Sequence, residues 1–162
     1  MSLVDALRGA EACKPALAWI EQYSTFEDAW DGCHRGDWLL WFAHILGVNP
    51  HLVVQTAIRC AQLGLKSKKL IVEVALAITW KAEEIDSSRI KRARWMVELA
   101  SHRGFAGPPD MDVLQLMVEV VRQQIPWSLV KAQTEIIDGK AIINMKLGPQ
   151  GLGCVVQNLT KK

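Results

Sequence analysis

The sequence predicts a mainly α fold, a compact helical bundle of about six to seven helices with a small C-terminal β-hairpin or meander. Apolar residues recur at i, i+3, i+4 and i+7 over most of residues 1–133, which is the spacing of one helix face. Capping residues and breaks that contain Gly or Pro separate these stretches. After residue 133 the apolar runs shorten around an Asp-Gly pair, which is typical of a two-residue hairpin turn. These observations together predict the fold class.

Helical segments are expected over residues 11–23, 25–33, 37–46, 51–65, 70–85, from 86 or 87 to about 102, 111–124 and 127–133. Ser24 and Glu27 have the spacing of a capping box at the second of these segments. Asp37 and Asp110 each precede an apolar run and are expected to cap the helix that follows. Asp86 or Ser87 is expected to cap the helix that runs to about residue 102. The segment 37–46 is apolar on almost every side, which favours a central, buried helix.

The last residues predict three short strands, at 134–137, 140–147 and 152–159, with turns at Asp138-Gly139 and at residues 148–151. We therefore expect a helical domain over residues 1–133 and a β-element over 134–162, packed together as one structural unit. An isolated hairpin is marginally stable in water, so helices or a partner must cover one face of it. The β-element could also pair with another chain and make a homo-oligomer.

Composition is that of an ordinary globular protein. The chain has 162 residues, 50% of them hydrophobic and 22% charged, which suits one domain with a sizeable core. No apolar run approaches the ~20 residues that a membrane-spanning helix needs, and a secretory pattern is absent from the first residues. We expect a cytoplasmic protein with no membrane partner. Residues 1–65 hold 4 Lys/Arg against 7 Asp/Glu, a net −3, while residues 66–162 hold 15 against 10, a net +5.

Residues 24–47 contain three of the seven tryptophans, Trp30, Trp38 and Trp41. We expect at least two of these rings in the aromatic core. An exposed ring would instead be a strong anchor for a protein partner, because Trp and Arg dominate binding hot spots.

Arg35 and Asp37 flank Gly36 in the same stretch. The simplest interpretation is structural: Asp37 caps a helix and Arg35 pairs with it or with nearby carbonyl groups. An arginine held beside aromatic rings in a rigid turn would also suit a carboxylate or a phosphate.

Catalytic motifs are missing from the sequence. His34, His44, His51 and His102 have no metal-binding spacing, and there is no G-x-S-x-G, phosphate-binding or dinucleotide-binding motif. The four cysteines form no C-x-x-C pair and are expected to be small buried thiols. We expect no enzyme activity, no cofactor and no metal. A zinc site built on Cys13, Cys33 and His34, or a hydrolase built from distant residues, stays an alternative that metal analysis would test.

A basic run offers a second alternative, a nucleic-acid-binding patch. The residues best placed for it are Lys68, Lys69, Arg89 and Arg92. Several glutamates lie between these cations and dilute them, so a solvated helix surface is the favoured interpretation and nucleic acid is not the expected partner.

The motif region also resembles a known family. The runs Cys13-Lys-Pro-Ala-Leu-Ala-Trp19 and Asp28-Ala-Trp30-Asp-Gly-Cys33-His-Arg35-Gly-Asp37-Trp38-Leu-Leu-Trp41 resemble the opening of small α-helical proteins that are predicted to be immunity proteins of bacterial polymorphic-toxin systems, with relatives in phage and plasmid genomes. The segments 77–86, 93–95 and 121–127 are similar to the same family, so that the resemblance covers roughly residues 11–133. The β-element after residue 133 is not part of the pattern.

The resemblance implies a non-catalytic protein that neutralises a toxin or effector by occlusion, burying about 800 Å² on each partner. The partner-binding residues expected on this basis are Glu27, Trp30, Asp31, Arg35, Asp37 and Trp38. The mildly acidic first part would suit a basic toxin. A phage or mobile-element inhibitor of a host defence complex would use the same physics, and the sequence does not separate these two roles.

Overall fold

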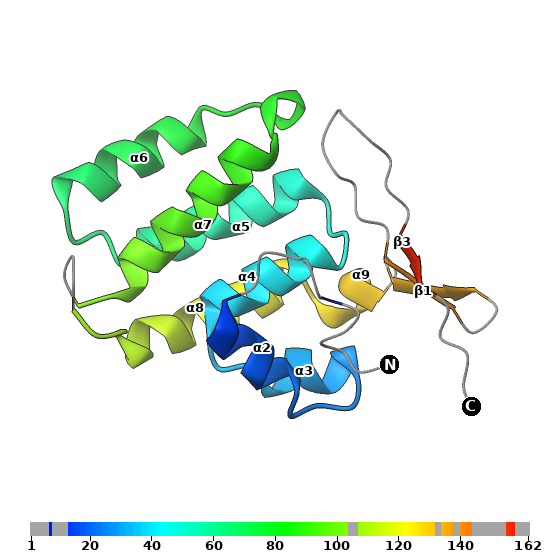
Figure 1. Cartoon of the computed structure of the whole chain (residues 1–162). Helices are drawn as coiled ribbons and strands as arrows, with labels where there is room; N and C mark the ends of the chain where they lie inside the picture. The colour runs from blue at the N-terminus through cyan, green and yellow to red at the C-terminus, as the bar shows by residue number, and fades with distance from the viewer. Residues whose placement is uncertain are drawn as a thin grey trace.

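The computed structural model describes residue 7, residues 13–103 and 107–131, and three strands (Figure 1). The α-helices in this part are α2 (Lys14–Ile20), α3 (Phe26–Gly32), α4 (Gly36–Ile45), α5 (Pro50–Gln62), α6 (Lys68–Ile78), α7 (Ser87–Ser101), α8 (Met111–Gln124) and α9 (Trp127–Lys131). A 3-10 turn, η1 (Ala82–Glu84), joins α6 to α7. The predicted mainly helical fold is confirmed. The described part holds eight α-helices, one for each of the eight segments expected above, so the expected total of about six to seven was too low. Pro126 separates the short α9 from α8.

The helices form one packed body around α4, α5, α7 and α8. Helix α5 packs on both α7 and α8, and α4 packs on α5, α7 and α8. Helix α6 lies at one edge of this body and contacts α5 and α7, whereas α2 and α3 lie at the opposite edge (Figure 1). The two edges are therefore separated by the central helices.

The core runs through the interior faces of these helices. Its largest fully buried side chains in the described part include Trp30, Phe42, Leu39, Leu40, Met96, Leu114 and Met117. Helix α4 buries Leu39, Leu40, Trp41, Phe42 and Ala43 in succession, so its predicted central position is confirmed. An all-apolar helix surface of this kind is stable only when neighbouring helices cover it on several sides.

Two of the predicted helix caps are wrong by one residue or more. Thr25, not Ser24, caps α3: its Oγ1 accepts from the backbone N of Asp28 at 3.1 Å and donates to the Asp28 carboxylate at 2.7 Å. Helix α4 begins at Gly36, so Asp37 lies in the first turn and does not cap it. The Asp37 carboxylate instead accepts hydrogen bonds from the guanidinium of Arg35.

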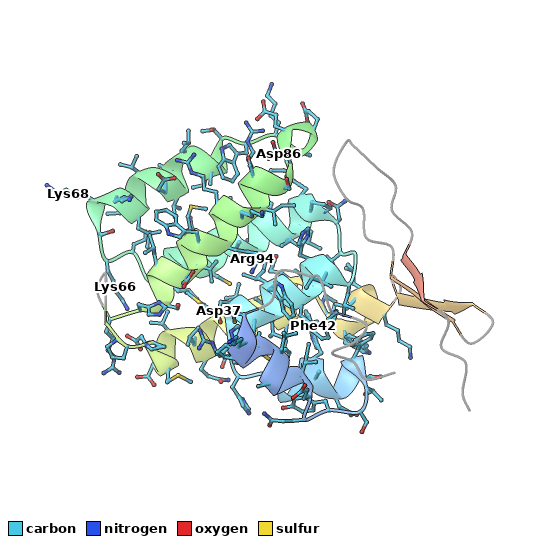
Figure 2. The ribbon with its side chains drawn as sticks, viewed as in Figure 1. Asp37, Phe42, Lys66, Lys68, Asp86 and Arg94 are labelled. Atoms are coloured by element: carbon cyan, nitrogen blue, oxygen red, sulfur yellow. The ribbon has the colours of Figure 1, made fainter. Side chains whose placement is uncertain are left out.

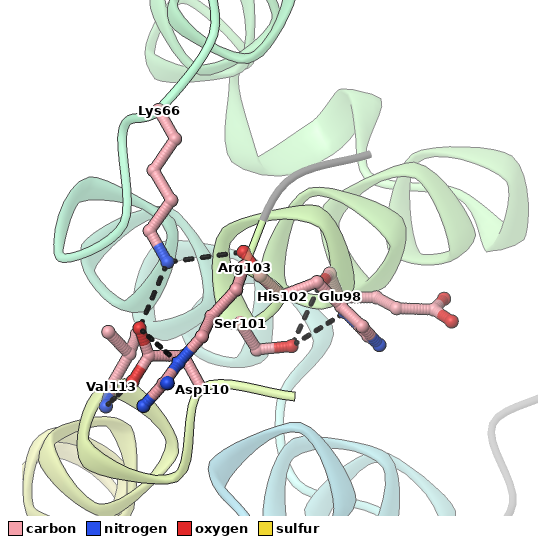
Figure 3. Close-up of polar contacts among 7 residues, drawn as sticks. All are labelled: Lys66, Glu98, Ser101, His102, Arg103, Asp110 and Val113. Atoms are coloured by element: carbon pink, nitrogen blue, oxygen red, sulfur yellow. Dashed lines mark hydrogen bonds and ion pairs between the residues drawn. The ribbon is translucent and has the colours of Figure 1, made fainter. Parts of the chain in front are cut away.

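The predicted cap at Asp110 is confirmed, and of the two alternatives Asp86 and Ser87 the structure uses Asp86. Asp86 accepts from the backbone N of Arg89 at 2.9 Å, and Asp110 accepts from the backbone N of Val113 at 3.4 Å. Figure 3 shows that Asp110 also receives Lys66 Nζ at 3.3 Å, and the same Nζ donates to the carbonyl of His102 at 3.1 Å. Lys66 therefore links the connection before α6 to the end of α7 and the start of α8.

Helix α4 ends where the sequence predicts. Gly47 has φ 89°, a left-handed conformation that glycine adopts without strain. The Asn49 side chain then accepts from the backbone N of His51 at 2.9 Å, and Pro50 occupies the first turn of α5.

Helix α6 is shorter than the predicted 70–85. It ends at Ile78, and the Thr79 hydroxyl donates to the carbonyl of Leu76 at 2.7 Å. A threonine that bonds its own helix end competes with continuation of the helix. Trp80 then turns inward and is buried, and the chain passes through η1 into α7.

The strands are β1 (Thr134–Ile137), β2 (Lys140–Ile143) and β3 (Val155–Gln157). They pair antiparallel in the order β1-β2-β3, with Ile136 opposite Ala141 and Ile142 opposite Val156. The predicted turns at 138–139 and 148–151 lie outside the described residues. The packing of a β-element on the helical domain, and the division at residue 133, stay predictions.

A search of the described helices for a candidate membrane span found none that is long and apolar enough.

Candidate protein-binding surfaces

The joint between α3 and α4 is held by an arginine from a distant helix. Arg122 of α8 directs its Nη2 at three backbone carbonyl oxygens, those of Trp30 at 2.8 Å, Asp31 at 2.6 Å and Cys33 at 3.0 Å. The last carbonyls of a helix have no partner within the helix, and a cation placed there satisfies them. The Cys33 thiol donates to the carbonyl of Arg35 at 3.3 Å. We call residues 32–38 the elbow.

Gly36 allows the elbow to touch α8. A Cβ at this position would lie 2.3 Å from the Cβ of Met117 and 2.8 Å from its carbonyl carbon. No side chain fits at these distances, so the first turn of α4 can approach the backbone of α8 only because residue 36 is glycine.

Arg35 and Asp37 satisfy each other. The guanidinium makes two bonds to the carboxylate, Nε to Oδ1 at 3.1 Å and Nη2 to Oδ2 at 2.8 Å, in the bidentate geometry that is strongest for this pair. The hydrogen bond with Asp37 raises the pKa of Arg35. The same guanidinium lies 4.6 Å from the centre of the Trp38 ring, which in turn lies 5.6 Å from Trp19. The guanidinium of Arg35 is therefore already paired with Asp37 and stacked near Trp38, and an external carboxylate or phosphate would have to compete with Asp37 for it.

A small pocket of about 200 Å³ opens beside this pair. It is lined by Cys13, Ala16, Arg35, Asp37, Trp38, Trp41, Arg94 and Glu98. Two guanidinium groups and two carboxylates contribute to the lining, so the pocket offers no excess of charge to an ionic ligand.

The three cysteines of the described residues, Cys13, Cys33 and Cys60, do not gather into a metal site. Burial raises the pKa of Cys33 and of Cys60 to about 12, which keeps both thiols protonated at neutral pH. Cys13 is exposed. In the described ranges no group of three or more His, Cys, Asp or Glu side chains could hold a metal ion.

The structure scatters the six residues expected to bind a partner. Trp30 is 1% exposed and packs between Phe42 and Trp127, with ring centres 6.3 and 6.1 Å away. The expectation that this ring contacts a partner therefore needs correction, because the core covers it. Glu27 and Asp31 are exposed on α3. The remaining three, Arg35, Asp37 and Trp38, are half-buried at the elbow and bonded to one another.

The four cations of the nucleic-acid alternative are mostly engaged with the protein itself. Arg92 makes a bidentate pair with Glu73, at 2.6 and 2.9 Å. Arg89 pairs with Glu84 at 3.4 Å and lies over the Trp80 ring, while Lys69 lies 5.1 Å from the centre of Trp95. Only Lys68 of the four shows no such contact to another described residue. These cations do not form a continuous basic patch.

Helix α6 carries the surface that the sequence interpretation missed. Leu70, Val74 and Ala77 face the core, at i, i+4 and i+7. Four large apolar side chains on the other sides of the helix remain between 47% and 64% exposed, namely Ile71, Val72, Leu76 and Ile78. Ala75 is exposed among them. We call Ile71, Val72, Ala75, Leu76 and Ile78 the α6 face.

Two further apolar side chains, Leu63 and Leu65, are exposed in the connection before α6. The sequence shows that this segment is apolar on nearly every side, because Glu73 is the one charged residue between Leu70 and Ile78. Such a pattern predicts a helix that other parts of the protein, or a partner, cover on all sides. The structure places the helix at an edge, so that one side of it stays uncovered (Figure 1).

Comparisons with protein-family models, with curated proteins and with solved structures found no match to this chain. The resemblance to the immunity-protein family therefore stays a prediction.

Proposed function

We propose that this protein is a non-catalytic protein-binding protein and that the α6 face is a contact surface. The observation that carries the proposal is the exposure of Ile71, Val72, Leu76 and Ile78 side by side on one helix at the edge of the fold. Contiguous apolar patches of this kind mark interaction sites more often than single exposed apolar residues do.

The chemistry of the α6 face favours a protein partner over the alternatives. A surface of aliphatic side chains on a single edge helix matches another helix or sheet face, which gains free energy by excluding water from both sides. A nucleic acid would need a patch of uncommitted cations, and most of the nearby cations are already bonded to Glu73, Glu84 or aromatic rings.

The role we propose for this binding is neutralisation of a toxin or effector by occlusion, in the bacterial cytoplasm, as the family resemblance implies. Exposed carboxylates on α3, those of Glu27, Asp28 and Asp31, would suit a basic partner at the opposite edge. Inhibition of a host defence complex by a phage or mobile-element protein is the variant of this role that uses the same surfaces. The β-element, packed on the helical domain, would add a further contact in either case.

Affinity capture from the native host, with and without phage infection, tests the proposal when it includes matched variants. Leu76→Lys places a charge on the α6 face. Leu116→Lys is the control, since Leu116 on α8 is 48% exposed and Leu76 is 47% exposed. We expect a stoichiometric protein partner with the wild type and with Leu116→Lys, and its loss with Leu76→Lys.

The acidic surface has its own test. Glu27→Lys combined with Asp28→Lys and Asp31→Lys should weaken the same complex if a basic toxin occupies α3. Capture that is equal for the wild type and Leu76→Lys would contradict the α6 assignment. Recovery of nucleic acid with an affinity that falls steeply with salt would favour the basic-patch alternative instead.

A further inference from the structure

We propose that the occupant of the α6 face is a second copy of this chain, with the two α6 helices packed antiparallel across a two-fold axis. This inference rests on the proposed function, because it uses the same face and names its occupant. A toxin or effector would then bind the dimer, for which the exposed carboxylates of α3 remain available. A two-fold interface brings one surface against an identical surface, so the face must be complementary to itself. The following features of α6 meet that condition.

The first feature is size. The six exposed apolar side chains of α6 and of the connection before it, at 41% to 64% exposed, present on the order of 500 Å² together. A standard interface buries about 800 Å² on each partner, of which the central part is apolar and the rim is polar. The α6 face supplies the apolar centre of such an interface, and the surrounding charged residues supply a rim.

The second feature is the distribution of charge along the helix. Lys68 and Lys69 lie at the start of α6. After its end, Glu83, Glu84 and Asp86 outnumber Lys81 and Arg89, of which Arg89 pairs with Glu84. Figure 2 shows Lys68 at one end of α6 and Asp86 near the other. Antiparallel pairing places the basic end of each helix against the acidic end of its copy, whereas parallel pairing would place like charges together. The helix dipoles favour the same orientation.

The third feature is the register. Ala75 lies at the middle of the α6 face, and its small side chain allows two helix backbones to approach within the about 8–10 Å of a packed helix pair. With Ala75 near the axis, antiparallel pairing would place Lys68, at the start of α6, toward the end of the copy's α6 and the η1 turn that follows it, which carries Glu83. Within the described part of the chain, Lys68 and Glu83 form no ion pair. Pairing across the two-fold axis would therefore break no existing ion pair of either residue.

Sedimentation velocity over a wide concentration range tests the inference directly on the purified full chain. We expect a monomer–dimer equilibrium, with Leu76→Lys raising the dimer Kd at least about tenfold and Leu116→Lys leaving it unchanged. Circular dichroism and thermal unfolding verify that both variants are folded, which we expect because both positions are exposed. A wild type that remains monomeric throughout, or a dimer that Leu76→Lys does not weaken, would overturn the inference.

Charge exchange and cross-linking test the antiparallel geometry. Lys68→Glu and Glu83→Lys should each weaken the dimer, and the double variant should restore it. Ala75→Cys, in a background with Cys13→Ser and Cys154→Ser, should form a covalent dimer with a short bis-maleimide reagent. Ala18→Cys, exposed on α2, is the matched control and should not. Cross-linking that is equal at both positions would refute the two-fold arrangement.

The two proposals fail in different ways. A monomeric protein that captures another protein through the α6 face, and loses it in Leu76→Lys, contradicts the second-copy inference and supports the proposed function. A dimer that depends on Leu76 while no other protein is captured supports the inference and removes the neutralising role.

Discussion

The elbow and the α6 face differ in where their side chains make contacts: the elbow contacts the rest of the protein, whereas the α6 face is exposed. The elbow has the most unusual sequence in the chain, yet Arg35 and Asp37 bond to each other, the Cys33 carbonyl accepts from Arg122 of α8, and the neighbouring Trp30 ring is buried in the core. The α6 segment has an ordinary apolar sequence, yet four of its six large apolar side chains are exposed. A distinctive motif can therefore serve the architecture, while a plain segment carries the binding surface. Burial, rather than sequence rarity, separates the two.

The comparison predicts that the two regions respond oppositely to substitution. Changes in the elbow and in the side chains that pack beside it, Trp30 and Arg122, should lower stability, whereas α6 changes should lower association while leaving the monomer stable.

The largest difference is expected between two truncations to alanine. Trp30→Ala removes a fully buried ring and should lower the free energy of unfolding by about 3–5 kcal/mol. Leu76→Ala removes an exposed side chain and should change it by no more than about 0.5 kcal/mol. Urea unfolding followed by circular dichroism, at a protein concentration low enough to keep the monomer, measures both. Similar losses for the two variants would break the comparison.

Adding volume should separate the regions again. Gly36→Ala forces a Cβ against Met117 at 2.3 Å, and we expect a loss of about 1–3 kcal/mol from overpacking. Ala75→Leu adds more atoms on the α6 face and should leave the monomer within about 0.5 kcal/mol of wild type. Thermal unfolding of the two variants side by side tests this. A neutral Gly36→Ala would show that α4 and α8 can move apart at little cost.

The arginines provide the third contrast. Arg122→Ala leaves three elbow carbonyls without their charged donor and should cost about 1.5–3 kcal/mol. Arg92→Ala breaks an exposed pair with Glu73 and should have little effect, because solvent screens such pairs. Arg122→Lys, which keeps the charge and loses the fork, should recover part of the stability. Chemical denaturation of the three variants measures their free energies of unfolding, and we expect the largest loss for Arg122→Ala and the smallest for Arg92→Ala.

The smallest effect is expected from pH. Burial, together with Arg94, lowers the pKa of His44, and its Nδ1 has no hydrogen-bond partner. The unfolded chain then binds a proton more readily than the folded chain, so stability should fall as the pH drops below about 6.5. The lowered pKa values of Glu73, Asp86 and Asp110 act only below about pH 4.5.

Unfolding of wild type and His44→Leu from pH 7.5 to pH 5.5 isolates the histidine. We expect the variant to lose most of the dependence on pH. A variant with the wild-type slope would assign the effect to other groups.

The caps at Asp86 and Asp110 and the end of α4 before Gly47 were readable because each depends on residues within a few positions of it. The Thr25 cap and the end of α6 at Ile78 were misjudged, since neighbouring Ser24 and Thr25 are equally capable caps and Thr79 carries only a weak stop signal. The elbow residues were recognised as a unit. Their partner Arg122, about ninety positions away, was not.

The sequence by itself determined the helical class, most helix positions and the absence of a catalytic motif, because periodicity and capping act over one or two turns. Only the tertiary structure decided that Trp30 is covered, that Arg122 holds the elbow and that α6 lies at an edge. An apolar helix has the same sequence whether neighbours surround it or leave one side open. Which side stays open depends on contacts between α6, α5 and α7, and these exist only once the chain has folded.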